Sequence, residues 1–280
     1  MKALQFARLI RPPNCVMIGF AVLVGEAVAA STVYATQRSL FGFLTGFCIC
    51  AYSMVLNDVL DEAVDRANGL DRPIVTGAVS PAQAARFAAA LLALGLLFSA
   101  FTGPYTFAVA AAFAALATAY NWRLKERGLP GNVAVALSMT IPFIYGGMVA
   151  GRPLGVLLDS MSLTAFLSGV GREVVKGMSD VEGDALRDAR TVARSHGPRT
   201  AARLGASFFL LAVLTSLFPV LAGLAGAAYY AVIGATDALF LYLAARITVD
   251  AGSSVAVKKW ALFGMLLGLI GYILQGLIGT

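Results

Sequence analysis

The sequence predicts an all-α polytopic membrane protein, a nine-helix transmembrane bundle that forms one domain over residues 1–280. The chain is 59% hydrophobic and 13% charged, whereas a soluble domain carries about twice that share of charged residues. Its apolar residues gather in windows of roughly 20, the length that crosses a hydrocarbon core of about 30 Å. An outer-membrane barrel would show short strands of alternating polarity, and the sequence has no such alternation.

Nine apolar windows are long enough to serve as membrane-spanning helices. They lie at 14–36, 39–57, 82–102, 104–122, 131–151, 156–176, 201–222, 224–245 and 256–277. The weakest is 156–176, because it contains Asp159, Arg172 and Glu173. The first window runs past the usual length of a signal-peptide core and is interrupted by Glu26, so we interpret it as a retained helix.

The basic residues predict the orientation. With a cytoplasmic N-terminus, every Lys and Arg except Arg38 and Arg152 falls on the cytoplasmic side, which is the side where such residues are in excess. We therefore expect a multi-pass protein of the cell membrane with its C-terminus outside. Topology and attraction to anionic membrane lipids explain the net charge of +6. No nucleic-acid or protein partner is predicted.

Two acidic clusters follow apolar windows on this cytoplasmic side. The first comprises Asn57, Asp58, Asp61 and Asp65, and the second comprises Asp180, Asp184 and Asp188. At about 100° per residue, the members of each cluster share one helix face. A carboxylate at membrane depth costs roughly 2.5–3.5 kcal/mol, so the clusters suggest a polyvalent ligand. Oxygen ligands without His or Cys select a hard cation such as Mg²⁺.

Other interpretations of these acids stay open at this point. They can be solvated loop residues paired with nearby arginines, or part of a proton or cation pathway. If they hold Mg²⁺, the metal keeps positions for substrate phosphates, and a diphosphate becomes the expected ligand. The basic candidates for its remaining oxygens are Lys125, Arg72, Arg66 and Lys176. Positive-inside topology also places basic residues here.

Three motifs resemble those of the UbiA-type intramembrane prenyltransferases. They are Asn57-Asp58-x-x-Asp61-x-x-x-Asp65 with Asn68 and Arg72-Pro73-Ile74-Val75-Thr76-Gly77, then Tyr120-Asn121-Trp122-Arg123-Leu124-Lys125, and finally Asp180-x-x-x-Asp184-x-x-x-Asp188. The resemblance covers the whole chain. It implies a nine-helix bundle around a central cavity, in which the two acidic motifs hold Mg²⁺. A prenyl diphosphate donor would bind through that metal.

Two further stretches resemble the archaeal branch of digeranylgeranylglyceryl phosphate synthases. They are Ile10-Arg11-Pro12-Pro13-Asn14-Cys15 and Arg172-Glu173-x-x-Lys176-x-x-x-Asp180-x-Glu182-Gly183-Asp184. This resemblance implies Mg²⁺-dependent transfer of a geranylgeranyl group from geranylgeranyl diphosphate to the free hydroxyl of a lipid-like acceptor, geranylgeranylglyceryl phosphate, in ether-lipid biosynthesis. Under this interpretation the catalytic acids are Asp61, Asp65, Asp180 and Asp184, and the candidate acceptor-binding residues are Arg11, Asn14 and Tyr120.

Two alternatives remain. A related enzyme with an aromatic acceptor, of the 4-hydroxybenzoate type, would share much of the second motif, and Arg11 would suit its carboxylate equally well. An ion-coupled transporter would also place acids in a membrane protein, but its sites lie near the bilayer midplane. Here both acidic clusters sit at one membrane face, which disfavours transport.

Overall fold

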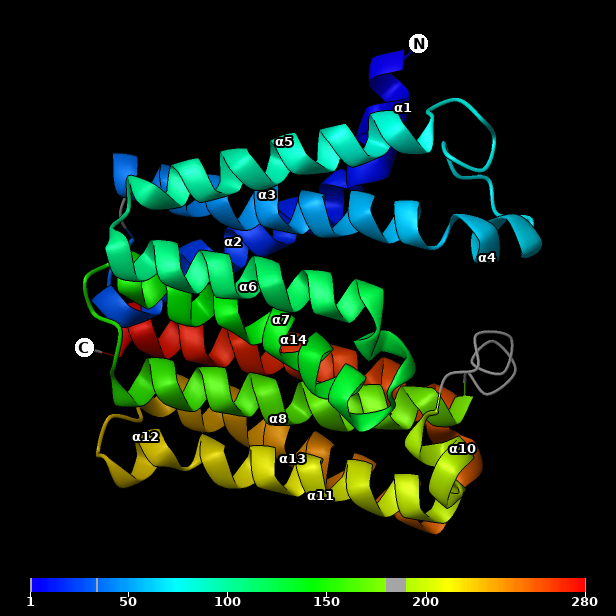
Figure 1. The fold of residues 1–280 in the computed structure, drawn as a ribbon. Helices are drawn as coiled ribbons and strands as arrows, with labels where there is room; N and C mark the ends of the chain where they lie inside the picture. Colours follow the sequence, from blue (N-terminus) through cyan, green and yellow to red (C-terminus); the bar gives the residue numbers. More distant parts are fainter. Residues whose placement is uncertain (1, 34, 180–189, 280) are drawn as a thin grey trace.

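The computed structural model describes residues 2–33, 35–179 and 190–279. Long helices lie side by side in a bundle (Figure 1), and the described residues contain no strand. The helices are α1 (Lys2–Ile10), α2 (Pro12–Ala30), α3 (Gln37–Leu60), α4 (Glu62–Ala67), α5 (Pro81–Ala100), α6 (Pro104–Trp122), α7 (Leu129–Val149), α8 (Val156–Ser179), α10 (Val192–His196), α11 (Pro198–Ser216), α12 (Phe218–Leu221), α13 (Ala227–Val249) and α14 (Ser254–Ile278). The all-α class is confirmed.

Seven segments of the described chain are helical, long and apolar enough to cross a membrane: α2, α3, α5, α7, Pro198–Leu221, α13 and Ala251–Ile278. Helices α6 and α8 are similar in length, with 19 and 24 residues, and lie in the same bundle, but they fall short in apolar character. In α8 the cause is its four charged residues, Asp159, Arg172, Glu173 and Lys176. The chain is thus a multi-pass membrane protein, while the count of nine spans stays a prediction.

The bundle has two halves that meet along α7 and α8. Helix α3 packs against α5 and α2, and α2 packs against α7. On the other side of α7, helix α8 packs against α11 and α14, and α13 lies against both of these. Figure 1 shows the two halves one above the other, with α5 and α11 at opposite margins.

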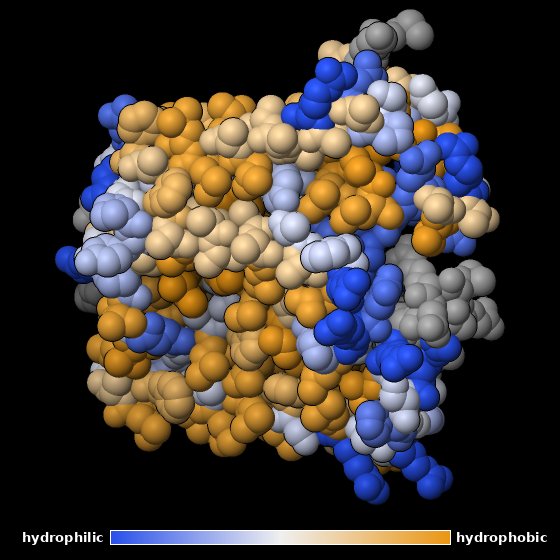
Figure 2. Space-filling model, viewed as in Figure 1, coloured by the Kyte–Doolittle hydropathy of each residue, from blue (hydrophilic) through white to orange (hydrophobic). Residues whose placement is uncertain are grey.

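Successive long helices run in opposite directions, so their connections gather at two ends of the bundle. Residues 61–80, 123–128, 190–197 and 250–253 lie at the end where Figure 1 shows α4 and α10. Figure 2 shows apolar side chains over the middle of the visible face and the densest hydrophilic surface at that same end. Among the described residues, nearly all Lys and Arg lie at this polar end, as the charge pattern predicts. Which side of a membrane it faces stays a prediction.

Helices α2 and α7 touch backbone to backbone. A Cβ added at Gly25 would lie 2.0 Å from the Phe143 carbonyl oxygen, and one at Gly146 would lie 2.0 Å from the Val22 carbonyl oxygen. No side chain fits between the helices at this crossing. Small residues permit such close approach in membrane bundles, where van der Waals packing contributes much of the association energy.

The first helical region is divided at Arg11. This residue has a left-handed backbone, with φ 50° and ψ 69°, and it precedes Pro12, whose ring disfavours a helical conformation at the preceding residue. Helix α1 therefore ends at Ile10. It lies at a steep angle to the long helices, at the margin of the bundle, while α2 runs inside the bundle (Figure 1). The predicted span 14–36 is too long at its C-terminal end, because Ser31 is also left-handed, with φ 56°, and ends α2 at Ala30.

Candidate functional site

The first acidic motif lies at the polar end of the bundle, where α3 passes into α4. Asn57 and Asp58 are in the last turn of α3, Asp61 joins the two helices, and Asp65 is in α4. Backbone hydrogen bonds of 2.9 Å from Asp61 to Asn57 and 2.8 Å from Asp65 to Asp61 continue across the joint. The helical register therefore persists, and the motif keeps a common face. Asp58 and Asp65 are almost fully buried, with 3% and 1% exposed.

Each of the three carboxylates meets a cation. Asp58 Oδ1 accepts from Arg11 Nη2 at 2.5 Å and also from Arg72. Arg72 Nη1 lies 2.9 Å from Asp65 Oδ2, and Lys125 contacts Asp61. Buried charges need such partners, since an isolated buried ion is strongly unfavourable. Three acidic and three basic side chains thus form a cluster with no formal net charge.

The motif divides into two pairs. Asp58 and Asp65 share Arg72, whereas Asn57 and Asp61 share a hydrogen bond of 3.0 Å from the Asn57 amide to Asp61 Oδ2. Positions 58 and 65 lie about 20° apart on the helical arc, but position 61 lies about 40° from both 57 and 65, so the arc alone does not group Asp61 with Asn57. The sequence predicts the shared face correctly, but it does not reveal that each pair has its own basic partner.

Asn121 completes the Asn57 side of the site. Its side-chain oxygen accepts from the Asn57 amide at 3.1 Å, and its own amide donates to Ser53 Oγ at 3.1 Å. These bonds join α6 to α3, and Asn121 is buried. Asn121 belongs to the second sequence motif, whose spacing does not predict a role for it. A buried amide near the end of an apolar helix is nevertheless a signal of a polar partner.

The other basic candidates lie in different surroundings. Arg66 pairs with Glu62 at 3.0 Å on the surface. Lys176 lies 3.4 Å from Glu173 Oε2, while the other oxygen of this buried carboxylate contacts Arg172. The pairing of Arg172 with Glu173 is a feature of the α8 end that the sequence reasoning did not identify.

The remaining acceptor candidates occupy two different helices. Asn14 is exposed in the first turn of α2, and Tyr120 is half-buried in the last turn of α6, next to Asn121. Arg11, the third candidate, contacts Asp58 directly. The structure therefore brings Arg11, Arg72 and Lys125 to the first acidic motif, and it places Arg66 on the surface.

The second acidic motif, Asp180, Asp184 and Asp188, lies outside the described residues. Its two flanks are described. Ser179 ends α8, and the Arg190 N–H donates to the Glu126 carbonyl at 2.9 Å. Glu126 follows Lys125 in the connection between α6 and α7. A Cβ at Gly128, which has φ +60°, would lie 2.3 Å from the Arg190 carbonyl oxygen. The chain after the second motif is thus fixed beside the loop that supplies Lys125.

The side chains of the first motif offer the type of ligand atom that Mg²⁺ prefers. Its ligand atoms are all carboxylate or amide oxygens, which hard cations prefer. The Asn57 amide nitrogen is used by Asp61 and Asn121, so its carbonyl oxygen is the atom left for a ligand. Within residues 2–33, 35–179 and 190–279, no three acidic, His or Cys side chains form a metal site. That the second motif completes a metal site stays a prediction.

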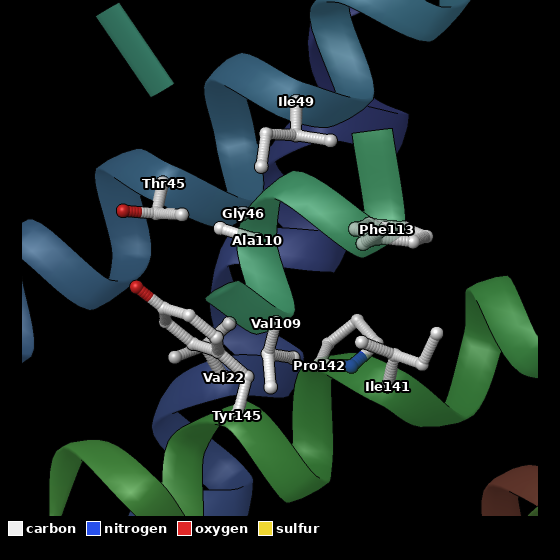
Figure 3. Close-up of a pocket in the computed structure, with 10 residues that line it drawn as sticks. All are labelled: Val22, Thr45, Gly46, Ile49, Val109, Ala110, Phe113, Ile141, Pro142 and Tyr145. Atoms are coloured by element: carbon white, nitrogen blue, oxygen red, sulfur yellow. The ribbon is translucent and has the colours of Figure 1, made fainter. Parts of the chain in front are cut away.

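A small apolar cavity lies deeper in the bundle, between α2, α3, α6 and α7. It measures about 20 Å³. Figure 3 shows the side chains around it, which are Val22, Thr45, Gly46, Ile49, Val109, Ala110, Phe113, Ile141, Pro142 and Tyr145. A space of this size has room for about one water molecule and is too small for a prenyl chain. The central cavity expected from the sequence stays a prediction.

The chain resembles known proteins over nearly its whole length. It is 37% identical over 270 residues to a digeranylgeranylglyceryl phosphate synthase of Archaeoglobus fulgidus, which covers 94% of this chain and 92% of that one. A digeranylgeranylglyceryl phosphate synthase of Methanopyrus kandleri is 35% identical, over 96% of this chain and 97% of the relative.

Solved structures agree with this fold. A structure from a study of digeranylgeranylglyceryl phosphate synthase in membranes has a TM-score of 0.90 at 27% identity, over 98% of both chains. A UbiA homologue from Archaeoglobus fulgidus, bound to GPP and Mg²⁺, has a TM-score of 0.71 at 19% identity, over 96% of this chain and 99% of that one. The sequence model of the UbiA prenyltransferase family matches residues 18–271. The chain therefore belongs to the UbiA prenyltransferase family.

Proposed function

We propose that this prenyltransferase moves a geranylgeranyl group from geranylgeranyl diphosphate to the free hydroxyl of geranylgeranylglyceryl phosphate, with Mg²⁺ as its cofactor. Full-length similarity to two digeranylgeranylglyceryl phosphate synthases supports this reaction. The structural observation that carries the proposal is the contact of Lys125 and Asp61 beside Asn57. This contact supports the proposal because a diphosphate bound through a metal needs a cation beside the metal's oxygen ligands.

The two motifs have distinct roles in this reaction. Asn57, Asp61 and Asp65 of the first motif, together with Asp180, Asp184 and Asp188 of the second, would hold Mg²⁺. The ion supplies charge compensation for the departing diphosphate. Lys125 and Arg72 donate charge-assisted hydrogen bonds to the diphosphate oxygens that the metal leaves uncovered. Arg66 and Lys176 stay further basic candidates for the diphosphate.

Asp58 acts through the arginines that it holds. It is 3% exposed and accepts from both Arg11 and Arg72, so it fixes two guanidinium groups at the entrance of α2 and beside α4. Arg11 is one-third exposed, and its remaining N–H groups suit the phosphate of the acceptor. Asn14 and Tyr120 stay candidates for the same acceptor.

The acceptor must be positioned because its nucleophile is an ordinary alcohol. Holding its phosphate at Arg11 fixes one end of the molecule, and proximity of this kind supplies several kcal/mol of barrier reduction. An apolar helical bundle also keeps water away from the allylic carbon, which would otherwise be hydrolysed. These two requirements explain why Arg11, Arg72 and Lys125 gather at the polar end of an otherwise apolar protein.

A product assay tests the proposal. Purified protein, Mg²⁺ and labelled geranylgeranyl diphosphate are incubated with geranylgeranylglyceryl phosphate or with 4-hydroxybenzoate in parallel. We expect a doubly prenylated glyceryl phosphate, no prenylated benzoate, and loss of product in excess EDTA. Prenylation of 4-hydroxybenzoate alone would transfer the chain to the aromatic-acceptor branch. Full product formation in EDTA would contradict the role of Mg²⁺.

A further inference from the structure

A surface groove lies between α1 and the beginning of α5, apart from the acidic cluster. It is shallow and open, with a volume of about 590 Å³. One wall is the α1 face of Ala3, Phe6, Ala7 and Ile10, and the other is formed by Arg86 and Phe87 of α5. The rings of Phe6 and Phe87 meet edge to face at 5.0 Å between centroids.

The groove lies at the margin of the bundle. Helix α5 forms one margin of the bundle (Figure 1), and only 28% of its most apolar window is buried inside the protein. The opposite side of α1 is attached to the core, because Leu9 is fully buried and Arg8 pairs with Asp71 at 3.0 Å. Helix α1 is therefore held in place, while its outer face and α5 form the walls of a shallow apolar groove.

Arg86 lies near the beginning of α5, at the polar end of the bundle. It comes five residues after Pro81, about 7.5 Å along the helix axis. Its side chain is exposed and donates only a long bond of 3.4 Å to the Ala82 carbonyl. In the part of the chain that the structure describes, no carboxylate forms an ion pair with it. Gln83 beside it is used by the α5 N-cap at Ser80.

We propose that this groove binds one anionic membrane phospholipid, with an acyl or isoprenoid tail along Phe6, Ile10 and Phe87 and its phosphate at Arg86. An apolar groove that ends at a guanidinium matches a molecule that is apolar at one end and anionic at the other. A peptide strand would bring backbone N–H and C=O groups that an apolar wall leaves unsatisfied. The bound lipid would hold α1 against α5.

Binding to the purified full-length chain tests the proposal. Native mass spectrometry in detergent follows titration with phosphatidylglycerol or phosphatidylcholine of identical tails. We expect one saturable phosphatidylglycerol. Arg86→Gln should weaken its binding about fivefold, because one basic group near a membrane surface contributes about 1 kcal/mol, and should leave phosphatidylcholine binding unchanged. Ala7→Trp, which fills the groove, should remove the saturable site.

Arg203→Gln is the matched control. Arg203 is exposed in α11, five residues after Pro198, at the same depth and the same end of the bundle. Equal weakening by Arg203→Gln and Arg86→Gln would show that surface charge alone retains the lipid. Unchanged lipid binding in Ala7→Trp would place the lipid elsewhere, and a protein dimer lost only in that variant would make a second copy the occupant. Either result overturns the proposal. Prenyl transfer should persist in all three variants.

Discussion

The ammonium group of Lys125 contacts Oδ1 of Asp61, although the two residues lie 64 positions apart. The contact joins the loop between α6 and α7 to the junction of α3 and α4. Both side chains are largely buried, so the pair is screened less than a surface ion pair. Lys125 is therefore held in place before any anionic substrate arrives, next to the oxygen atoms of Asn57 and Asp61.

Replacing Lys125 should reduce catalysis far more than it reduces substrate binding. We expect Lys125→Met to lower kcat about 10²–10³-fold, because removal of one preorganised donor to a developing negative charge has that effect in other enzymes. Radiolabelled product formation at saturating donor measures it. The control is Lys259→Met, an exposed lysine on α14. A kcat within twofold of wild type for Lys125→Met would remove Lys125 from the site.

Asp58 and Asp61 should respond differently to loss of charge. Asp58→Asn should lower the free energy of unfolding by about 2 kcal/mol, because two partly exposed arginines lose their buried partner. It should leave the Mg²⁺ concentration for half-maximal activity unchanged. Asp61→Asn should raise that concentration at least tenfold. Thermal unfolding and Mg²⁺ titration separate the two effects. An equal rise in both variants would make Asp58 a metal ligand.

Arg11 should affect the acceptor more than the donor. If it binds the acceptor phosphate, Arg11→Ala loses a charge-assisted hydrogen bond of roughly 1.5–3 kcal/mol, and the KM for geranylgeranylglyceryl phosphate should rise about tenfold or more. The KM for geranylgeranyl diphosphate should change less than threefold. Steady-state kinetics with each substrate varied in turn provide the comparison. A larger effect on the donor would place Arg11 at the diphosphate.

Adding a methyl group where α2 and α7 cross should destabilise the protein. Gly146→Ala would bring a Cβ to 2.0 Å from the Val22 carbonyl oxygen, and overpacking typically costs about 1–3 kcal/mol. Thermal unfolding in detergent should show a clear decrease in Tm. Gly155→Ala is the control, because no atom lies within 4 Å of the added Cβ. Equal Tm values for the two variants would contradict the close approach.

The orientation can be tested with single cysteines. In a background without Cys15, Cys48 and Cys50, an impermeant thiol reagent should reach T191C and R127C only when the cytoplasmic face is open. A35C lies at the opposite end of the bundle and should react from outside. Reaction of T191C and A35C from the same side would overturn the nine-span topology.

Local patterns were enough to predict much of the first motif. Helical spacing put Asn57, Asp58, Asp61 and Asp65 on one face, and the structure keeps that register through the joint at Asp61. The boundaries were less certain, because they depend on single backbone conformations. The left-handed Ser31 ended α2 six residues before the predicted limit.

Partners that are distant in sequence could not be read from spacing. Arg11 meets Asp58 across 47 residues, and Asn57 meets Asn121 across 64. Both contacts depend on how α2 and α6 are placed around α3, and that placement follows from packing over the whole bundle. The sequence supplied the list of basic candidates, and tertiary structure separated Lys125 and Arg72 from Arg66.

The glycine contact between α2 and α7 also governs the polar end of the bundle. Helix α2 begins directly after Arg11, and α7 begins four residues after Lys125. With Gly25 and Gly146 in backbone contact, neither helix can slide along or roll against the other without a steric clash. Arg11 and Lys125 therefore lie next to helices whose relative position is fixed. Such a template meets an anionic substrate with little reorganisation, which is the condition under which electrostatic stabilisation of a transition state is largest.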